Sequence, residues 1–338
     1  MKRILVFVFL FFSVSVSFAQ QQDAKQLYAT AKEFMRQGDY DNATLVLNSA
    51  LKQDPINLDM LKDLAFLNYL KRDFARSIEI SKTLIEREDA DEQCFQMLGI
   101  TYKAIAEHKE CNKLYKRGLK KFPNSGVLYN DFGELLAMDK DINGAIEQWE
   151  KGIEIAPNYS SNYYNAANYY ARVENIFPVL IYGELFINLE SYSTRTADIK
   201  AILLEAYKKL FTADNITKLM NDKQAGNFQR SFLATIEKST SLAAEGLTPE
   251  NLTAIRTRFI LDWYHEKSQD KFPFRLFDHQ QYLLQEGLFD AYNQWIFGAA
   301  ASPSAYQIWN QSNEKKAADF KQFQHSRVFK IPTGQYYH

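Results

Sequence analysis

The residues best suited to metal binding or acid-base chemistry do not stand at the spacings that such chemistry needs. His265 and Glu266 begin the His-Glu-x-x-His pattern of zinc proteases, but Gln269 occupies the position of the second histidine ligand. None of the five histidines lies at a metal-ligand spacing from another histidine or a cysteine, and the chain has no glycine-rich phosphate loop and no Gly-x-Ser-x-Gly turn. We therefore predict no catalytic residues, no metal ligands and no cofactors. An enzyme with an unrecognised site in the C-terminal region stays open as an alternative.

Residues of one kind instead recur every 34 positions, which indicates repeated pairs of helices. Small residues form one column: Ala31, Ala65, Gly99, Gly133 and Ala167. A second small column follows later in each repeat: Ala43, Ser77, Cys111 and Ala145. Bulky residues form a third: Leu27, Leu61, Phe95, Tyr129 and Tyr163. Two antiparallel helices approach closely only where side chains are small, so the small columns should face each other, as Gly133 and Ala145 would.

The stretch 95–123 carries the spacing W-x2-L-G-x2-Y, A-x3-F and P with related residues substituted. These positions hold Phe95, Leu98, Gly99, Tyr102, Cys111, Tyr115 and Pro123. The stretch resembles a tetratricopeptide repeat. The resemblance implies an all-α fold, a right-handed tetratricopeptide-repeat solenoid of helix-turn-helix units with a helical C-terminal cap. Residues 22–190 hold four clear repeats and a degenerate fifth, in which Val179, Gly183 and Phe186 depart from the expected columns.

Residues 191–338 have a helical pattern that does not align with the repeat. Thr248 before Pro249 and Ser302 before Pro303 are typical of helix starts. The region is rich in Phe, Tyr and Trp, which predicts a compact cap over the open end of the solenoid. An aromatic ligand-binding platform is the alternative. We expect residues 328–337 to form a short extended tail over this cap.

The first 19 residues have the three parts of a secretory signal peptide. Lys2 and Arg3 precede an apolar run at 4–12, and Ser17 to Ala19 form a small-x-small cleavage site. The run is shorter than the roughly 20 residues that span a bilayer. We therefore expect an exported protein, periplasmic or alternatively secreted, without stable membrane insertion. A net charge of -1 without a basic cluster gives no support for nucleic-acid binding.

The resemblance also bears on the two cysteines. In a tetratricopeptide arrangement Cys111 would lie level with Gly99 and Tyr102, whereas Cys94 lies five to eight residues away from that level on the antiparallel helix. At 1.5 Å per residue this offset is about 8 to 12 Å, beyond the roughly 7 Å between Cα atoms that a disulfide allows. We therefore predict two thiols, even in an exported chain.

Tetratricopeptide arrays use the concave inner face of each first helix to bind peptides or proteins, and the resemblance carries this role to matching positions here. The ligand-groove residues are Tyr28, Lys32, Arg36, Lys62, Phe66, Tyr69, Gln96, Lys103, Asn130, Tyr164 and Asn168. Other residues on the same face are Lys25, Met35, Asp59, Glu134 and Arg172. The four aromatic side chains in this set have no packing column to fill and are of a kind enriched at interfaces. A merely solvated helix face is the alternative.

The groove positions carry more positive than negative charge. Six of them are cationic and two are anionic, which leaves a surplus of four positive charges. We therefore predict a non-catalytic protein-protein interaction scaffold or adaptor in the cell envelope, whose partner is an acidic protein or peptide segment with aromatic anchors. An envelope glycan-binding protein is a further alternative. The sequence does not indicate an oligomeric state.

Overall fold

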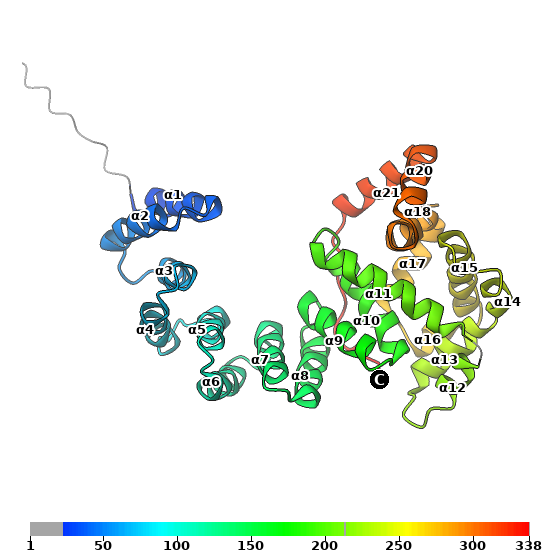
Figure 1. The fold of residues 1–338 in the computed structure, drawn as a ribbon, viewed down its shortest axis with the longest axis horizontal. Coiled ribbons are helices and arrows are strands. Elements are labelled where there is room, and N and C mark those ends of the chain that lie inside the picture. The colour runs from blue at the N-terminus through cyan, green and yellow to red at the C-terminus, as the bar shows by residue number, and fades with distance from the viewer. Residues whose placement is uncertain (1–22, 213, 338) are drawn as a thin grey trace, which may run out of the picture. The chain divides into compact units, whose positions relative to one another are not determined.

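The computed structural model describes residues 23–212 and 214–337, and these residues form helices and loops without any strand (Figure 1). The all-α prediction is confirmed. The predicted signal peptide, residues 1–19, lies outside the described residues. The described residues divide into two compact units, one up to residue 101 and one from residue 102 onward, which are described separately.

The first unit consists of helix pairs. Helix α1 (Ala24–Gln37) packs on α2 (Tyr40–Gln53), and α3 (Leu58–Leu70) packs on α4 (Phe74–Ile85). Helix α5 (Glu92–Ala104) begins in this unit. The second unit continues with α6 (His108–Lys121), α7 (Gly126–Met138), α8 (Ile142–Ile155), α9 (Ser160–Arg172), α10 (Ile176–Leu189) and α11 (Thr194–Leu210).

The helix boundaries follow the 34-residue register of the sequence. The first helices of the pairs begin at residues 24, 58, 92, 126 and 160, and α11 begins on the same register at 194. The second helices begin at residues 40, 74, 108, 142 and 176. This confirms the helix-turn-helix units of a tetratricopeptide solenoid.

Each turn within a pair contains one residue with a positive φ, at the same place in every repeat. These residues are Gly38, Arg72, Ala106, Lys140 and Glu174, with φ between 59° and 77°. Three of the turns continue with an aspartate that accepts a hydrogen bond from the first turn of the second helix: Asp39, Asp73 and Asp141. A side chain in the left-handed conformation costs roughly 1–2 kcal/mol, so the turns without glycine are strained.

Small residues of both columns are buried in the first two helix pairs, which is consistent with the predicted helix crossings. Ala31, Ala43 and Ala65 have no exposed surface. At Gly133 the atoms nearest to an added Cβ belong to Trp149, which follows Ala145 by one turn of α8, at 2.3 Å for Nε1; the pairing of Gly133 with Ala145 itself stays a prediction. The indole ring fills the space that the missing side chain leaves.

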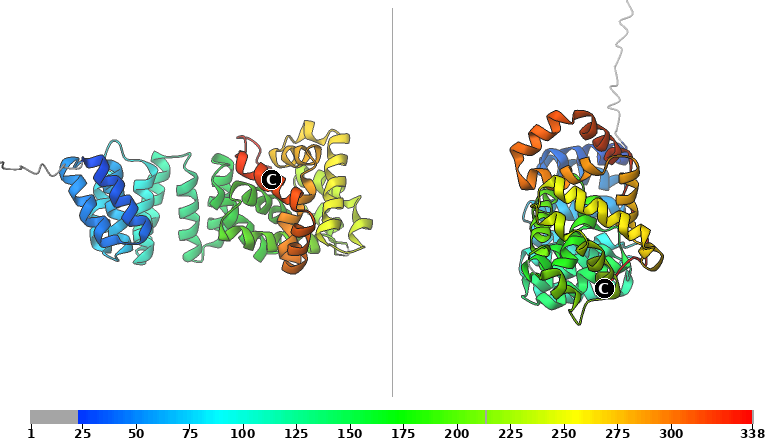
Figure 2. Two further views of the ribbon diagram at one scale, coloured as in Figure 1. Left: turned by 90° about the horizontal axis from the view of Figure 1, so that it is seen from above. Right: turned by 90° about the vertical axis from the view of Figure 1, so that its right-hand side faces the viewer.

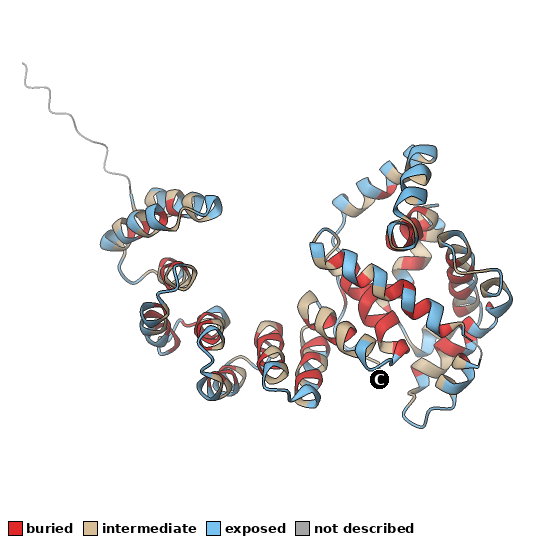
Figure 3. Ribbon diagram, viewed as in Figure 1, coloured by how far each residue is buried: buried red, intermediate tan, exposed pale blue. Residues whose placement is uncertain are grey.

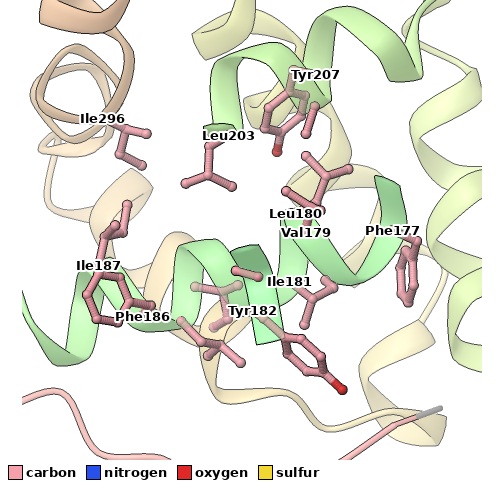
Figure 4. Close-up of a cluster of buried hydrophobic side chains, with 14 of the residues drawn as sticks. Phe177, Val179, Leu180, Ile181, Tyr182, Phe186, Ile187, Leu203, Tyr207 and Ile296 are labelled. Atoms are coloured by element: carbon pink, nitrogen blue, oxygen red, sulfur yellow. The ribbon is translucent and has the colours of Figure 1, made fainter. Parts of the chain in front are cut away.

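Helix α10 is apolar on nearly every side because it has neighbours on nearly every side. Eleven of its 14 residues are buried, and it appears red along most of its length in Figure 3. Figure 4 shows Leu180 and Ile187 of this helix in the same buried cluster as Leu203 and Tyr207 of α11. Its departure from the repeat pattern therefore reflects burial by the C-terminal region.

The C-terminal region is a helical cap, as predicted, and gathers beside α10 and α11 (Figure 2). Its helices are α12 (Asn215–Met220), α13 (Asn227–Glu237), α14 (Thr240–Ala243), α15 (Pro249–His265), α16 (Ser268–Lys271), α17 (Arg275–Gln285), α18 (Phe289–Asn293), the π-helix η1 (Gln294–Gly298), α19 (Ala299–Ala301), α20 (Pro303–Ser312) and α21 (Glu314–Ser326). Rings of Phe228, Phe232, Phe259, Trp263 and Phe277 form its interior.

A buried ion pair joins the cap to the repeats. Arg256 of α15 pairs with Glu184 of α10, and both side chains are at most 4% exposed. Gln280 and Tyr292 also donate to Glu184 Oε1, at 2.6 and 2.8 Å. Each charge is thus hydrogen-bonded, which a buried ion pair requires.

The predicted extended tail is present after α21. Its residue Ile331 is 3% exposed and is held by the Asn158 side chain, whose Oδ1 accepts from the Ile331 N–H at 2.8 Å and whose Nδ2 donates to the Ile331 carbonyl at 3.0 Å. Tyr337 stacks on Phe228 at 4.6 Å between ring centroids. The tail therefore covers the cap and also reaches the loop before α9.

Candidate binding surface on the first helices

Two predicted groove residues of α1 are organised by an aspartate of α3. The Tyr28 hydroxyl donates to Asp63 Oδ2 at 2.7 Å, and the Lys32 ammonium lies 4.7 Å from the centroid of the Tyr28 ring. Burial and the contact with Asp63 raise the pKa of Tyr28, so its hydroxyl remains a donor at neutral pH. The ring is consequently held in place before any ligand binds. Arg36, at the end of α1, instead pairs with Glu33 in an exposed contact.

Lys62 is not the free cation that its position suggested. Its ammonium lies 2.6 Å from Asp91 Oδ2 and 2.9 Å from Asp59 Oδ1, and it donates to Gln93 Oε1 at 2.9 Å. Only 12% of its side chain is exposed. Burial by itself would lower the pKa of Lys62, but hydrogen bonds to both carboxylates raise it. The residue ties α3 to the start of α5.

An aromatic pair lies beside this lysine on α3. The rings of Phe66 and Tyr69 stack with centroids 6.1 Å apart and an interplanar angle of 11°, and Tyr69 also contacts Phe74 at 5.9 Å. Both rings are half-buried, as is Gln96 on α5. The prediction that these aromatic side chains lie outside the buried core is consistent with this exposure.

A row of polar contacts crosses the first helices of the second unit. Lys103 Nζ lies 2.8 Å from Glu134 Oε2, and Asn130 Nδ2 donates to Glu134 Oε1 at 2.9 Å. Asn165 Nδ2 then donates to Asn130 Oδ1 at 2.8 Å. Burial by itself would lower the pKa of Lys103, but the carboxylates of Asp131 and Glu134 raise it, so the ammonium stays charged. The row connects residues of α5, α7 and α9.

An arginine of α11 lies beside the predicted groove residue Tyr164 of α9. The Arg195 guanidinium lies 4.8 Å from the centroid of the Tyr164 ring, and it binds Glu190 Oε2 at 2.5 Å and Ser161 Oγ at 3.2 Å. Asn168 uses one side-chain N–H to bond the Tyr164 carbonyl on its own helix, at 2.8 Å.

The structure corrects the charge count for the groove. Three of the six predicted cations, Arg36, Lys62 and Lys103, form ion pairs, and the carboxylates of Glu33 and Asp91 were not included in that count. With these two carboxylates included, the net positive charge along the groove is smaller than the predicted surplus of four.

Sequence reasoning missed three residues that shape these faces: Asp63, Asn165 and Arg195. Arg195 could have been found, because it takes the same place in the α11 register as Lys25 takes in α1. Asp63 and Asn165 lie one position after a predicted groove residue, and only the helix packing reveals their contacts.

The remaining candidates for chemistry are dispersed. Both cysteines are buried; the Cys94 thiol lies 3.3 Å from Asp91 Oδ1, and burial raises the pKa of Cys94 to about 11 and that of Cys111 to about 12. His265 is exposed at the end of α15. Within residues 23–212 and 214–337, no three His, Cys, Asp or Glu side chains gather closely enough to hold a metal ion. None of the helices described combines the length and the apolar character needed to cross a membrane.

Comparisons with known proteins find similar folds at low sequence identity. No protein-family model matches the sequence. The N-terminal acetyltransferase A complex auxiliary subunit NAA15 of Arabidopsis thaliana is 24% identical over 85 residues, which are 25% of this chain and only 10% of that protein. The solved structure of TTC0263, a thermophilic TPR protein in Thermus thermophilus, covers 55% of this chain and 99% of its own, with a TM-score of 0.45 and 15% identity. Pseudomonas aeruginosa pilF covers 62% of this chain and 95% of its own, with a TM-score of 0.46 and 16% identity.

Proposed function

We propose that this chain is a non-catalytic protein-interaction scaffold whose first-helix faces bind an extended segment of a partner protein. The observation that carries the proposal is the set of Tyr28, Phe66 and Tyr69 in the first unit. These rings are half-buried, and they are held by the bond to Asp63 and by mutual stacking. Rings that are ordered in advance lose little entropy on binding, and aromatic side chains supply much of the energy at protein interfaces.

The polar residues of the second unit, taken by themselves, suit the backbone of an extended segment. A side-chain amide has two N–H donors and one acceptor oxygen. Among the described residues, Asn165 and Asn168 each use one donor, in the contacts to Asn130 and to the Tyr164 carbonyl. Their remaining capacity can pair with the N–H and C=O groups of an extended chain, which must be hydrogen-bonded when they leave water.

Charge adds a preference for acidic partners. Among the described residues, Lys25 and Lys32 on α1 form no ion pair, so they can attract a negatively charged segment. Contacts of this kind mainly raise the rate of association and orient the partner. The signal-peptide pattern of residues 1–19 supports an exported protein that meets its partner in the periplasm or outside the cell.

The decisive experiment compares partner capture by matched variants of the tagged mature chain, using envelope extract and mass spectrometry. We expect Tyr28→Ala, Phe66→Ala and Tyr69→Ala together to abolish capture of the main protein partner. The control variant combines Leu45→Ala and Ile56→Ala, which remove large side chains that are 67% and 72% exposed and lie outside the first helices. Circular dichroism checks that both variants fold. Equal capture by the two variants, or capture of polysaccharide without protein, would contradict the proposal.

The charge preference has its own test once a partner segment is known. Lys25→Ala with Lys32→Ala should weaken binding of that segment at low salt, and the loss should shrink as salt screens the interaction. The matched control is Lys52→Ala with Lys82→Ala, two exposed lysines of the second helices. If both pairs of substitutions weaken binding equally, the effect reflects net charge instead of the first-helix face.

A further inference from the structure

A cavity of about 330 Å³ lies within the second unit, between α17, α21 and the start of the extended tail. Helices α17 and α21 are labelled in Figure 1. Its lining includes Arg275, His279 and Tyr282 of α17 and Phe323 of α21. Arg327, the first residue after α21, completes it. The volume lies in the range typical of small-ligand sites. This cavity is separate from the first-helix residues to which the proposed function assigns partner binding.

Two arginines line the cavity, and neither forms an ion pair with a carboxylate among the described residues. Arg327 donates to the Tyr282 hydroxyl at 2.6 Å, and its guanidinium lies 4.4 Å from the centroid of that ring. Arg275 donates through Nε to the Lys330 carbonyl at 3.3 Å. A guanidinium has five N–H donors. The hydrogen bonds of Arg327 to Tyr282 and of Arg275 to the Lys330 carbonyl therefore leave further donors on both side chains for an anionic ligand.

The other titratable groups of the lining do not neutralise this pair. Asp278 also lines the cavity, but its Oδ1 accepts from the Tyr264 hydroxyl of α15 at 2.5 Å. His279 is neutral at physiological pH, because burial, reinforced by Arg275 and Arg327, lowers its pKa to about 4. Two arginines against one aspartate leave one positive charge in excess.

Aromatic rings form the rest of the binding space. The His279 ring stacks on Phe323 at 5.8 Å with an interplanar angle of 25°, and Tyr282 stacks on the same Phe323 ring at 5.9 Å and 23°. Phe329, on the tail, meets the His279 ring at 5.2 Å. Flat apolar surfaces therefore lie next to the two guanidinium groups.

We propose that this cavity binds a carboxylate carried on an aromatic or apolar body. Arginine presents paired N–H donors that match the two oxygens of a carboxylate. A single negative charge matches the excess of one positive charge, whereas a phosphate dianion would leave a charge uncompensated next to Asp278. The same chemistry occurs in a free aromatic acid and in the C-terminal residue of a protein chain, and the experiment below separates these sources.

Isothermal titration calorimetry of the mature chain at neutral pH tests the proposal with N-acetylphenylalanine and its amide. We expect the acid to bind and the neutral amide to bind at least roughly tenfold more weakly, since hydrogen bonds from arginine to a charged carboxylate are stronger than those to a neutral amide. N-acetylalanine, which lacks the ring, should also bind more weakly. If N-acetylphenylalanine shows no saturable binding at millimolar concentration, or if the amide binds as well as the acid, the proposal is wrong.

Variants then locate the site. Arg327→Gln should weaken binding of the acid roughly tenfold or more, while Arg258→Gln, at an exposed arginine of α15 that does not line the cavity, should not. Thermal melts establish that both variants remain folded. Equal affinity of the two variants would overturn the assignment of the site. A peptide that ends in phenylalanine should bind more tightly than N-acetylphenylalanine if the natural ligand is a chain terminus, and more weakly if it is a free acid.

Discussion

Gly133→Ala is the substitution for which the packing predicts a loss of stability that helix propensity alone would not. An added Cβ would lie 2.3, 2.6 and 2.8 Å from Nε1, Cδ1 and Cε2 of the Trp149 ring. That ring is 7% exposed, and its Nε1 donates to the Asn130 carbonyl at 3.2 Å. The ring must therefore move, and movement breaks its hydrogen bond.

Three contributions set the size of the effect. Alanine gains about 1 kcal/mol over glycine in a helix. Overpacking costs about 1–3 kcal/mol, and leaving a buried indole N–H unpaired costs about 1–3 kcal/mol. The net loss is about 1–5 kcal/mol, with a central value of about 3 kcal/mol. At about 2–4 °C per kcal/mol for a domain of this size, the midpoint of thermal unfolding should fall by about 6–12 °C.

Urea and thermal unfolding of the variant measure this loss, and a second substitution tests its cause. Trp149→Phe removes the indole nitrogen that the added Cβ meets first, so Gly133→Ala should cost less in the Trp149→Phe background than in the natural chain. If Gly133→Ala raises the unfolding midpoint, or if the stability losses of the two substitutions simply add, then contact of Trp149 with Gly133 does not limit this position.

Three further predictions concern a turn, a histidine and the thiols. Lys140→Gly should stabilise the chain by about 0.5–1 kcal/mol, because φ is 65° there, whereas Lys140→Ala should have little effect; chemical denaturation checks both. Burial lowers the pKa of His279 to about 4, so the unfolded state takes up a proton at a higher pH than the folded state. The free energy of unfolding should therefore fall by up to about 3 kcal/mol as the pH falls from about 7 to 4, and this part of the loss should vanish in His279→Gln. Cys94 and Cys111 should both react with an alkylating agent in the unfolded, unreduced protein, and a mass short of both thiol hydrogens would contradict this.

The repeat register was predictable because it depends on contacts between residues close in sequence. Small residues every 34 positions mark where two consecutive helices cross, and the helices begin on that register from residue 24 to residue 194. The strained turns escaped prediction. Arg72, Ala106, Lys140 and Glu174 adopt a left-handed conformation that their side chains do not indicate, since glycine is the residue that favours it.

The candidate binding surface was predictable only as a set of positions. The side chains of Tyr28, Phe66 and Tyr69 are only half-buried, as expected for residues that belong to none of the packing columns. The pairing of the charges was not predictable in the same way. Besides Asp59 on its own helix, Lys62 binds Asp91, just before α5, and Lys103 binds Glu134 of α7; these two carboxylates lie 29 and 31 residues later in the chain.

The sequence by itself therefore determined the all-α class, the repeat and the positions on each first helix, since a periodic pattern of small and bulky residues is enough to specify them. The tertiary structure alone decided which lysines stay unpaired, that Trp149 fills the space at Gly133, and that Arg275 and Arg327 line one cavity. The physical reason is the periodicity of the residue types. Small and bulky residues at the helix crossings recur every 34 positions, whereas the ion pairs and the cavity depend on side chains whose types do not recur from one repeat to the next.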